Sequence, residues 1–376
     1  MDGIIERRAG TPQVVLVLQG GGALGAYQAG VFEALHEAGI APDWVIGTSI
    51  GAINAALIAG NASAERLPRL RAFWDRVAYD PVLEAWAGLP GLSGLVPRWA
   101  TVMGGVAGFF RPNPLAFLGW EMPLTPERAG YYSTAPLAET LAGLLDPERL
   151  NACAPRLTVG AANLRTGEMR YFDSRDMPLG IPHVMASGAL PPAFPAVRIE
   201  GELCWDGGIL SNTPVECVFD DCPRRDSLVF AVHIWNPQGP EPGTIAQVLH
   251  RQKDLQYASR AASHIRRQQQ IHRLRHVINE LAVRVPKAAQ EEPAFQELAS
   301  YGCRTVMHVV RLLAPGLDNE DHAKDIDFSR AGIRARWAAG LADTRRALAA
   351  RPWEHTADPL EGFVLHELQR ETMPAM

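Results

Sequence analysis

Two glycine-framed turns near the start of the chain hold residue types suited to nucleophilic chemistry. The first is Gly20-Gly21-Gly22-Ala23-Leu24-Gly25, and the second is Gly47-Thr48-Ser49-Ile50-Gly51. Each turn follows a short apolar run, where a strand should pass into a helix. Gly-x-Ser-x-Gly at such a junction is typical of a nucleophile elbow, in which small flanking residues allow a tight turn and the serine projects outward. The pattern predicts that Ser49 is a nucleophile framed by Gly47 and Gly51.

The first glycine turn is suited to stabilise negative charge beside that serine. Ser49 would lie at the N-terminus of its helix, where unpaired N–H groups and the helix dipole favour an anion. The backbone N–H groups of Gly20, Gly21 and Gly22 can be aimed at the same point. Together the two turns predict a serine hydrolase with an oxyanion hole.

The glycine turn also fits G-x-G-x-x-G, the pattern of a dinucleotide-binding loop. That interpretation needs an acidic residue at the end of the second strand. Gly47-Thr48-Ser49 stands there instead, and Asp43 precedes the strand at its wrong end. We therefore prefer the oxyanion interpretation, which uses both turns, and keep a nucleotide-binding protein as the alternative from another functional class.

A serine nucleophile needs a base, and Asp206 is the strongest candidate. It stands in Cys204-Trp205-Asp206-Gly207-Gly208, at the end of an expected strand and before two glycines. A Ser–Asp–His triad that includes His233 is the competing interpretation. His233 lies in the middle of an apolar run, where a histidine is more often structural, so we favour a pair of Ser49 and Asp206.

The elements that must position these residues are those of an α/β protein. Residues 14–60 read as strand, glycine turn, helix (about 24–37), strand (44–46), tight turn and helix (52–59). Further along, a helix is expected near 137–145, a strand pair at 156–161 and 168–172, a hairpin at 196–205, and a strand at 228–234. This order predicts a mostly parallel central sheet in an α/β fold.

Two regions depart from that pattern. Residues 81–120 are rich in Trp, Phe, Gly and Pro, and such an insertion could form a lid or lipid-entry surface, or could cover the core. Residues 244–281 repeat apolar positions at helical spacing, with a further strand near 303–313 and a helix near 328–350. Within them, 251–276 carries seven basic residues, which we interpret as a solvated helix face rather than a membrane-binding face.

Composition excludes several other classes. The 376 residues are 47% hydrophobic and carry a net charge of −5, which gives no general attraction to nucleic acid. Five cysteines without a CxxC pair favour free thiols over disulfides or a zinc site. The N-terminus is polar and the apolar runs are short, so we expect a cytoplasmic protein with at most peripheral membrane contact.

Taken in order, these motifs resemble the patatin-like phospholipase family. The glycine turn at 20–25, the elbow at 47–51, the stretch Ala186–Pro195 and Asp206-Gly207-Gly208 match its signatures over about 220 residues. The resemblance implies a three-layer α/β/α fold and a Ser–Asp dyad of Ser49 and Asp206. It implies an oxyanion hole at Gly20, Gly21 and Gly22, with Gly25, Gly207 and Gly208 as motif glycines.

The resemblance also implies a substrate class. Acyl-ester hydrolysis of lipids (phospholipase A or lysophospholipase-like) through an acyl-serine intermediate would need neither metal nor organic cofactor. Hydrolysis of non-membrane acyl esters or thioesters by the same dyad is the alternative within the class, and an idle scaffold is a third. Leu24 departs from the Lys or Arg of many members, which we expect to be neutral for catalysis.

The expected domain organisation follows. Residues 1–13 form a tail, 14–238 the patatin-like catalytic domain, and 244–376 a mainly helical C-terminal extension packed on it. Two stretches of that extension, 251–257 and 324–330, are similar to a bacterial subfamily of the same proteins. The resemblance implies no role for the extension.

Overall fold

The computed structural model describes residues 11–79, 101, 103–117, 119, 121–317, 320, 323–354 and 362–367, without the side chains of 259–262. Within this part of the chain, one sheet of nine strands runs in the order β11-β10-β9-β1-β2-β5-β8-β7, and β6 also pairs with β5. The strands from β11 to β5 are parallel, whereas β6, β7 and β8 join by antiparallel pairing. The predicted mostly parallel sheet is confirmed.

The strand bounds lie close to the expected ranges. The strands of the large sheet are β1 Gln13–Leu18, β2 Trp44–Thr48, β5 Arg156–Asn163, β6 Met169–Asp173, β7 Val197–Ile199, β8 Glu202–Asp206, β9 Ser227–His233, β10 Met307–Leu313 and β11 Phe363–Glu367. A separate two-stranded sheet pairs β3 Arg111–Pro112 with β4 Tyr132–Ser133. The expected pair at 156–161 and 168–172 is β5 with β6, and the hairpin at 196–205 is β7 with β8.

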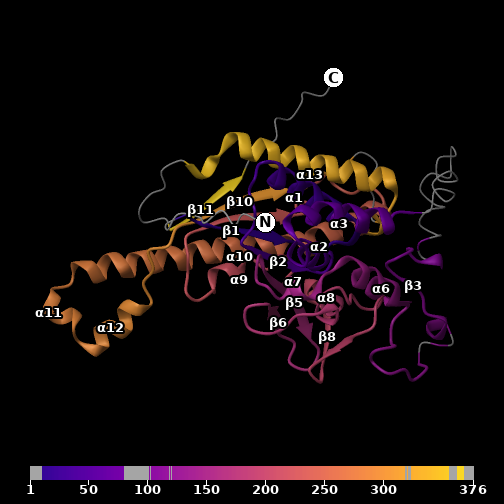
Figure 1. The fold of residues 1–376 in the computed structure, drawn as a ribbon, viewed down its shortest axis with the longest axis horizontal. Coiled ribbons are helices and arrows are strands. Elements are labelled where there is room, and N and C mark those ends of the chain that lie inside the picture. Colours follow the sequence, from indigo (N-terminus) through magenta and orange to yellow (C-terminus); the bar gives the residue numbers. More distant parts are fainter. Residues whose placement is uncertain are drawn as a thin grey trace.

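Helices cover both faces of the large sheet (Figure 1). The helices are α1 Ala26–Glu37, α2 Ile50–Ala59, α3 Ser63–Arg76, α6 Ala135–Leu144, α7 Pro147–Leu150, α8 Ile181–Ser187, α9 Glu216–Phe219, α10 Ile245–Arg284, α11 Lys287–Gln290, α12 Pro293–Ser300 and α13 Arg330–Ala350. Short 3₁₀ turns are η1 Gly22–Gly25, η2 Pro114–Phe117, η3 Gly207–Ile209, η4 Lys324–Ile326 and η5 Pro352–Glu354.

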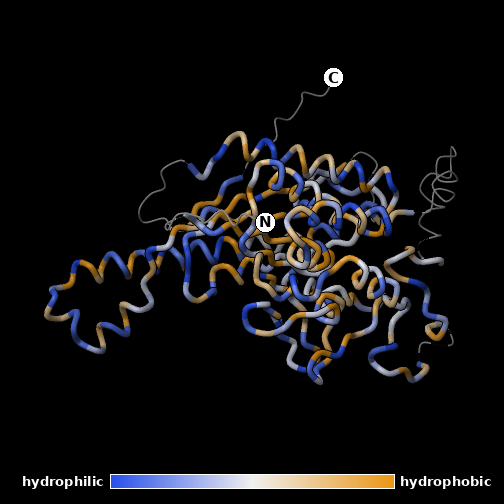
Figure 2. Tube along the Cα trace, viewed as in Figure 1, coloured by the Kyte–Doolittle hydropathy of each residue, from blue (hydrophilic) through white to orange (hydrophobic). Residues whose placement is uncertain are grey.

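Alternation along β1 shows how the layers form. Leu16 and Leu18 belong to a core shared with α1, α2, α3 and α13, whereas Val15 and Val17 belong to a second core shared with α9 and α10. Successive side chains of a strand point to opposite faces, so a strand buried on both faces reads as a continuous apolar run. Figure 2 shows this run as an orange interior between the two helical layers. The three-layer α/β/α architecture is confirmed.

The C-terminal region is built into the catalytic fold. Its strands β10 and β11 extend the central sheet next to β9. Its last long helix, α13, packs on α1 so closely that a Cβ at Gly340 would lie 2.0 Å from the Tyr27 carbonyl oxygen. The region is helical in large part, as expected, but the sheet crosses the expected boundary near residue 240. That domain division stays a prediction.

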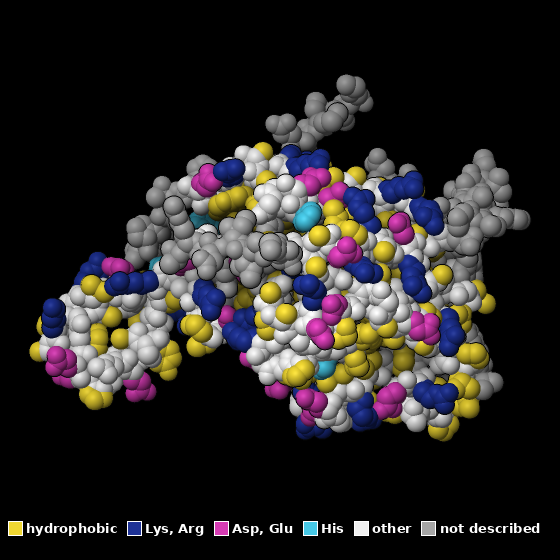
Figure 3. All heavy atoms as spheres, in the orientation of Figure 1, with side chains coloured by type: hydrophobic (Ala, Val, Ile, Leu, Met, Phe, Trp, Pro, Cys, Tyr) yellow, Lys and Arg dark blue, Asp and Glu magenta, His cyan; other side chains and the backbone are white. Residues whose placement is uncertain are grey.

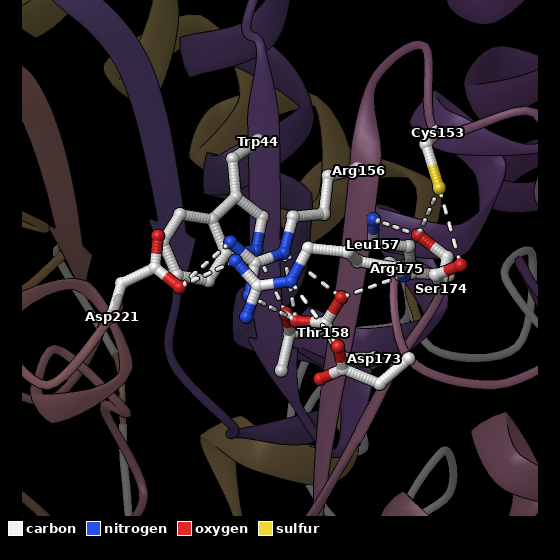
Figure 4. Close-up of polar contacts among 10 residues, drawn as sticks. Trp44, Cys153, Arg156, Leu157, Thr158, Asp173, Ser174, Arg175 and Asp221 are labelled. Atoms are coloured by element: carbon white, nitrogen blue, oxygen red, sulfur yellow. Dashed lines mark hydrogen bonds and ion pairs between the residues drawn. The ribbon is translucent and has the colours of Figure 1, made fainter. Parts of the chain in front are cut away.

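An ion-pair network fastens the amino ends of β2 and β5 (Figure 4), whereas Ser49 follows the other end of β2. The Arg156 guanidinium lies between the Asp173 and Asp221 carboxylates, at 2.7 and 3.0 Å, and 3.7 Å from the centre of the Trp44 ring. All four side chains are largely buried, so each charge depends on its partner. This network serves the fold and takes no part in the site described below.

The outer part of α10, with α11 and α12, projects from the body as an arm (Figure 1). Both signs of charge are interspersed on its visible surface in Figure 3. In the basic segment 251–276, Lys253 pairs with Asp325 at 2.8 Å, whereas Arg266 and Arg267 are exposed. Among the described helices, none combines the length and apolar character that crossing a bilayer requires.

Candidate active site

Ser49 stands at a strained turn between β2 and α2. Its φ of 58° and ψ of −126° lie where non-glycine residues are rare, and such strain is typical of functional positions. A Cβ at Gly47 would lie 2.2 Å from the Gly51 carbonyl oxygen, and one at Gly51 would lie 2.2 Å from the Leu18 carbonyl oxygen. Only glycine fits at both positions, so the two residues allow the elbow to pack against the end of β1.

Asp206 lies at the end of β8 and meets Ser49 there. Its carboxylate accepts a hydrogen bond from the Gly208 N–H at 2.7 Å, and it lines the same cavity as Ser49, whose hydroxyl is near enough to lower its pKa. Its own backbone N–H donates to the Ala189 carbonyl oxygen at 2.9 Å. Asp206 is 1% exposed, and burial raises its pKa to about 7 against the opposing effects of the Ser49 hydroxyl and the Gly208 N–H. A carboxylate with this pKa can accept and return a proton near neutral pH.

Ser187, at the end of α8, holds the elbow from behind. Its hydroxyl accepts a hydrogen bond from the Ser49 backbone N–H at 3.0 Å and donates to the Gly160 carbonyl oxygen at 2.6 Å. The side chain is fully buried. The sequence patterns did not predict this contact. The signal for a closer role was its place in the Ala186–Pro195 stretch, which carries the family resemblance.

The glycine turn lies against the same point. The Gly20 N–H donates to the Asn212 carbonyl oxygen at 3.1 Å, and its carbonyl oxygen accepts from Asn212 Nδ2 at 3.0 Å and Trp235 Nε1 at 2.7 Å. The N–H groups of Gly21 and Gly22 find no acceptor within the described part of the chain. Of the three glycines expected to donate to an oxyanion, Gly20 is therefore already engaged, and Gly21 and Gly22 remain available.

The remaining motif positions have structural surroundings. Leu24 is buried in the core and Gly25 lies against Ile50, where a Cβ would come within 2.6 Å of the isoleucine side chain. Gly207 and Gly208 form the turn that follows Asp206. An apolar residue at 24 thus fits its buried position.

A cavity of about 160 Å³ opens beside Ser49 and Asp206. An apolar cavity of about 150 Å³ can bind benzene, so this one has room for a segment of an acyl chain. One wall is a cluster of aromatic rings that pack on one another, and its members are Phe109, Phe110, Tyr132, Phe194 and Phe328. Phe109 and Phe110 come from the insertion predicted at 81–120 and are buried here. Residues 80–100, on which most of the lid prediction falls, lie outside the described residues.

The C-terminal region supplies part of this cavity, which the sequence did not predict. Tyr257 from α10, Asp325 and Ile326 from η4, and Phe328 all line it. Both stretches contribute to the family resemblance, but no local pattern indicates that residues about 210 to 280 positions away from Ser49 would meet it. The extension is therefore part of the site.

His233 does not join the site. It is 1% exposed at the end of β9, it is not among the residues that line the cavity, and its Nε2 atom has no partner within the described structure. Burial, with a smaller effect of Arg311, lowers its pKa to about 3, so the ring is neutral. Asp43, weighed for the nucleotide interpretation, instead accepts a hydrogen bond from the Val14 N–H at 2.7 Å, at the opposite end of the sheet. The structure therefore supplies neither the histidine that a triad needs nor the acidic residue that a dinucleotide-binding loop needs.

The other titratable residues offer no metal centre in the part of the chain that is described, where no cluster of three or more His, Cys, Asp or Glu side chains is suited to hold an ion. All five cysteines are described, and each is a free thiol.

Comparison with known proteins identifies the family. A family model of patatin-like phospholipases matches residues 16–218, more than half of the chain, and a second model described as patatin phospholipase matches residues 255–360. The chain belongs to the patatin-like phospholipase family, which consists of serine acyl hydrolases. The second match covers much of the C-terminal region that lines the cavity.

Individual relatives are similar over short stretches. Lysophospholipase nte1 of Aspergillus terreus is 55% identical over 58 residues, which are 15% of this chain and 4% of that protein. Patatin-like phospholipase domain-containing protein 6 of Homo sapiens is 43% identical over 74 residues, which are 19% of this chain and 5% of that protein. The chain thus spans only about 4–5% of the length of these relatives.

Solved structures show weaker likeness. VipD from Legionella pneumophila aligns with a TM-score of 0.32 and 15% identity, over 88% of this chain and 67% of its own. Human GIVD cytosolic phospholipase A2 aligns with a TM-score of 0.31 and 13% identity, over 58% of this chain and 42% of its own. These scores are too low to support conclusions about this chain.

Proposed function

We propose that this protein hydrolyses lipid acyl esters by a Ser–Asp dyad, with Ser49 as nucleophile and Asp206 as base. The observation that carries the proposal is the meeting of Ser49, on its strained elbow, with the buried Asp206 in one cavity, where burial raises the Asp206 pKa to about 7. The strained elbow, the two available N–H groups and the apolar cavity support it.

In the first half-reaction Ser49 Oγ attacks the acyl carbonyl carbon while its proton passes to the Asp206 carboxylate. The carbonyl oxygen becomes an oxyanion, which the N–H groups of Gly21 and Gly22 stabilise. The tetrahedral intermediate then collapses, the bond to the leaving alcohol breaks, and Asp206 returns the proton to that alcohol. An acyl-serine remains.

In the second half-reaction water attacks the acyl-serine while Asp206 takes one of its protons. Collapse of the second tetrahedral intermediate releases the fatty acid, and Asp206 returns the proton to Ser49 Oγ. No histidine is needed, because a carboxylate with a pKa near 7 accepts a proton at neutral pH more readily than an ordinary one.

Substrate class follows from the aromatic wall. Five packed rings beside the nucleophile favour a hydrocarbon chain in the cavity, because burial of apolar surface is the main source of affinity there. Membrane lipids, lysophospholipids and glycerides all present such a chain. We propose lysophospholipase or phospholipase A activity, with hydrolysis of non-membrane esters or thioesters as the alternative.

The test is product analysis by mass spectrometry after incubation with mixed phospholipid vesicles. We expect free fatty acid and lysophospholipid from the wild type and none from Ser49→Ala or Asp206→Asn, whereas His233→Ala stays active per folded molecule. A histidine triad would instead lose several orders of magnitude with His233→Ala. Full activity of Ser49→Ala would contradict the dyad, and cleavage of soluble esters alone would favour the non-membrane alternative.

Peripheral membrane contact through residues 81–120 and the basic segment 251–276 would bring the cavity to its substrate. The exposed side chains of Arg266 and Arg267 make this testable. If the basic segment binds anionic lipid, the double variant R266E/R267E should reduce sedimentation with anionic vesicles at low salt and leave hydrolysis of a soluble ester unchanged. Unchanged sedimentation would show that the basic segment is only a solvated helix face and does not bind the vesicles.

A further inference from the structure

Besides its aromatic wall, the cavity has a side that carries polar groups. Residues of the C-terminal region form this polar side. Tyr257 of α10 and Asp325 of η4 line the same cavity as Ser49 and Asp206. The acyl-binding rings pack on one another, whereas the Tyr257 ring stacks on Trp235, with ring centres 4.9 Å apart and planes 29° apart. The reacting pair thus lies in a cavity with an aromatic wall and a polar region.

Tyr257 is fixed next to the oxyanion turn. The Trp235 ring on which it stacks donates its Nε1–H to the Gly20 carbonyl oxygen at 2.7 Å. The buried Gln19 side chain accepts hydrogen bonds from the backbone N–H groups of Ile234 and Trp235, at 2.6 and 3.1 Å. A ring held by such contacts presents its hydroxyl from a defined position.

That hydroxyl has unused hydrogen-bonding capacity. It has no partner in the described part of the chain, although the residue is only partly exposed. Burial, with smaller effects of Asp206 and Asp325, raises the pKa of Tyr257, so the hydroxyl keeps its proton at neutral pH. A hydroxyl that lines an enclosed cavity can donate to or accept from a polar ligand group.

Asp325 is held beside it by charge pairs. Lys253 Nζ lies 2.8 and 2.9 Å from the two Asp325 carboxylate oxygens, which retain further acceptor capacity. The neighbouring Lys324 forms an ion pair with Asp254 at 2.7 Å, and both side chains are at most 7% exposed. This buried pair ties η4 to α10.

The same segment closes on the glycine turn. The Asp325 carbonyl oxygen would lie only 2.2 Å from a Cβ at position 22, and Gly22 has a φ of 56°. Only glycine is compatible with both the close approach and the backbone conformation. This close packing fixes the position of Asp325, on the polar side of the cavity, relative to the oxyanion turn.

We propose that Tyr257 and Asp325 form a leaving-group subsite that recognises an alcohol with additional hydroxyl groups, such as the glycerol part of a lipid. The inference rests on the proposed function, since it needs an acyl chain on the aromatic wall and the ester carbonyl at Ser49. A phenolic hydroxyl and a carboxylate together offer one donor and several acceptors, which match the free hydroxyls of a glycerol ester. An ester of a simple alcohol would leave them without a partner.

The test compares two esters of one acyl chain, 1-monodecanoylglycerol and propyl decanoate, at equal mole fraction in detergent micelles. The two differ only in the two further hydroxyls of the leaving alcohol. We expect the wild type to have a kcat/KM at least about tenfold higher for the glycerol ester, and Tyr257→Phe and Asp325→Asn each to reduce that ratio about five- to tenfold. Tyr301→Phe is the matched control, because Tyr301 is 64% exposed and follows α12 on the arm. Its ratio should equal that of the wild type.

The ratio is internal to each sample, so a partly unfolded variant does not change it. Equal kcat/KM of the wild type for both esters would overturn the subsite, and so would a Tyr257→Phe variant that loses activity on both esters by one factor. Ser49→Ala separates this inference from the proposed function. If Ser49→Ala is inactive on both esters while Tyr257→Phe keeps the wild-type ratio, only the subsite fails. If Ser49→Ala is active, or if the wild type cleaves neither ester, the proposed function fails as well.

Discussion

The buried Asp206 carboxylate should reduce the stability of the protein as the pH rises, and Asp206→Asn should remove that effect. Its pKa is about 7 in the folded protein, against an ordinary value of 3.8. A raised pKa means that the folded state binds the proton more tightly than the unfolded state does. The contribution of this proton to stability is complete below pH 3.8 and is lost as the pH rises through 7.

The magnitude follows from the shift. A difference of about 3 pKa units corresponds to about 4 kcal/mol, at about 1.4 kcal/mol for each unit. Of these 4 kcal/mol of unfolding free energy, about 2 kcal/mol is lost as the pH rises to 5, and nearly all of it is lost by pH 8. The amide of Asp206→Asn does not ionise. The free energy of unfolding of the variant, relative to that of the wild type, should therefore increase by about 2–3 kcal/mol between pH 5 and pH 8.

The assay is urea unfolding of both proteins at pH 5, 6, 7 and 8. Taking the difference cancels the titration of all other groups. Ser49→Ala is the matched control, since it is also expected to be inactive but keeps the carboxyl group. Because the Ser49 hydroxyl lowers the pKa of Asp206, this variant should lose more stability with rising pH than the wild type does. A difference between Asp206→Asn and wild type that stays constant from pH 5 to 8 would refute a buried carboxylate with a raised pKa.

Three further predictions concern activity and the fold. The kcat/KM for a soluble ester should rise with pH to a plateau with a midpoint near 7, because only ionised Asp206 accepts the Ser49 proton; a midpoint below 5 in a pH–rate profile would contradict this. Ser187→Ala should lower kcat about tenfold and the free energy of unfolding by about 1–3 kcal/mol, because the Ser49 backbone N–H loses its acceptor. Steady-state kinetics measures the first and urea unfolding the second. Unchanged values of both would show that Ser187 does not position Ser49. Arg156→Met should destabilise the protein by about 3–5 kcal/mol, because the buried Asp173 carboxylate loses its ion-pair partner and Asp221 keeps only Arg175. The kcat of the folded fraction should be preserved, and a loss of kcat without a loss of stability would place the network in the site instead.

Much of the fold could be predicted because its signals are local. A buried strand reads as an apolar run, and Gly-x-Ser-x-Gly after such a run specifies the turn into a helix within five residues. The expected strands at 14–18, 156–161 and 228–234 are β1, β5 and β9, and their mostly parallel order follows from intervening helices. In contrast, the sequence patterns predict neither β11 nor α3, and the strand predicted at 303–313 begins only at Met307, as β10.

The sequence by itself determined which residues carry the chemistry proposed here. Ser49 needs its glycine-framed elbow, and Asp206 needs a strand end followed by glycines; both requirements are met within a few neighbouring residues. Family membership follows from the same motifs.

Only the tertiary structure decided what surrounds that pair. The raised pKa of Asp206, the acceptor that Ser187 offers to the elbow, and the exclusion of His233 all depend on burial and contacts between distant segments. The same is true of Tyr257 and Asp325, which reach the cavity because β10 joins β9 and the Lys324–Asp254 pair ties η4 to α10. Such contacts join residues up to about 300 positions apart, and no pattern in neighbouring residues encodes them, because packing and desolvation depend on the whole fold.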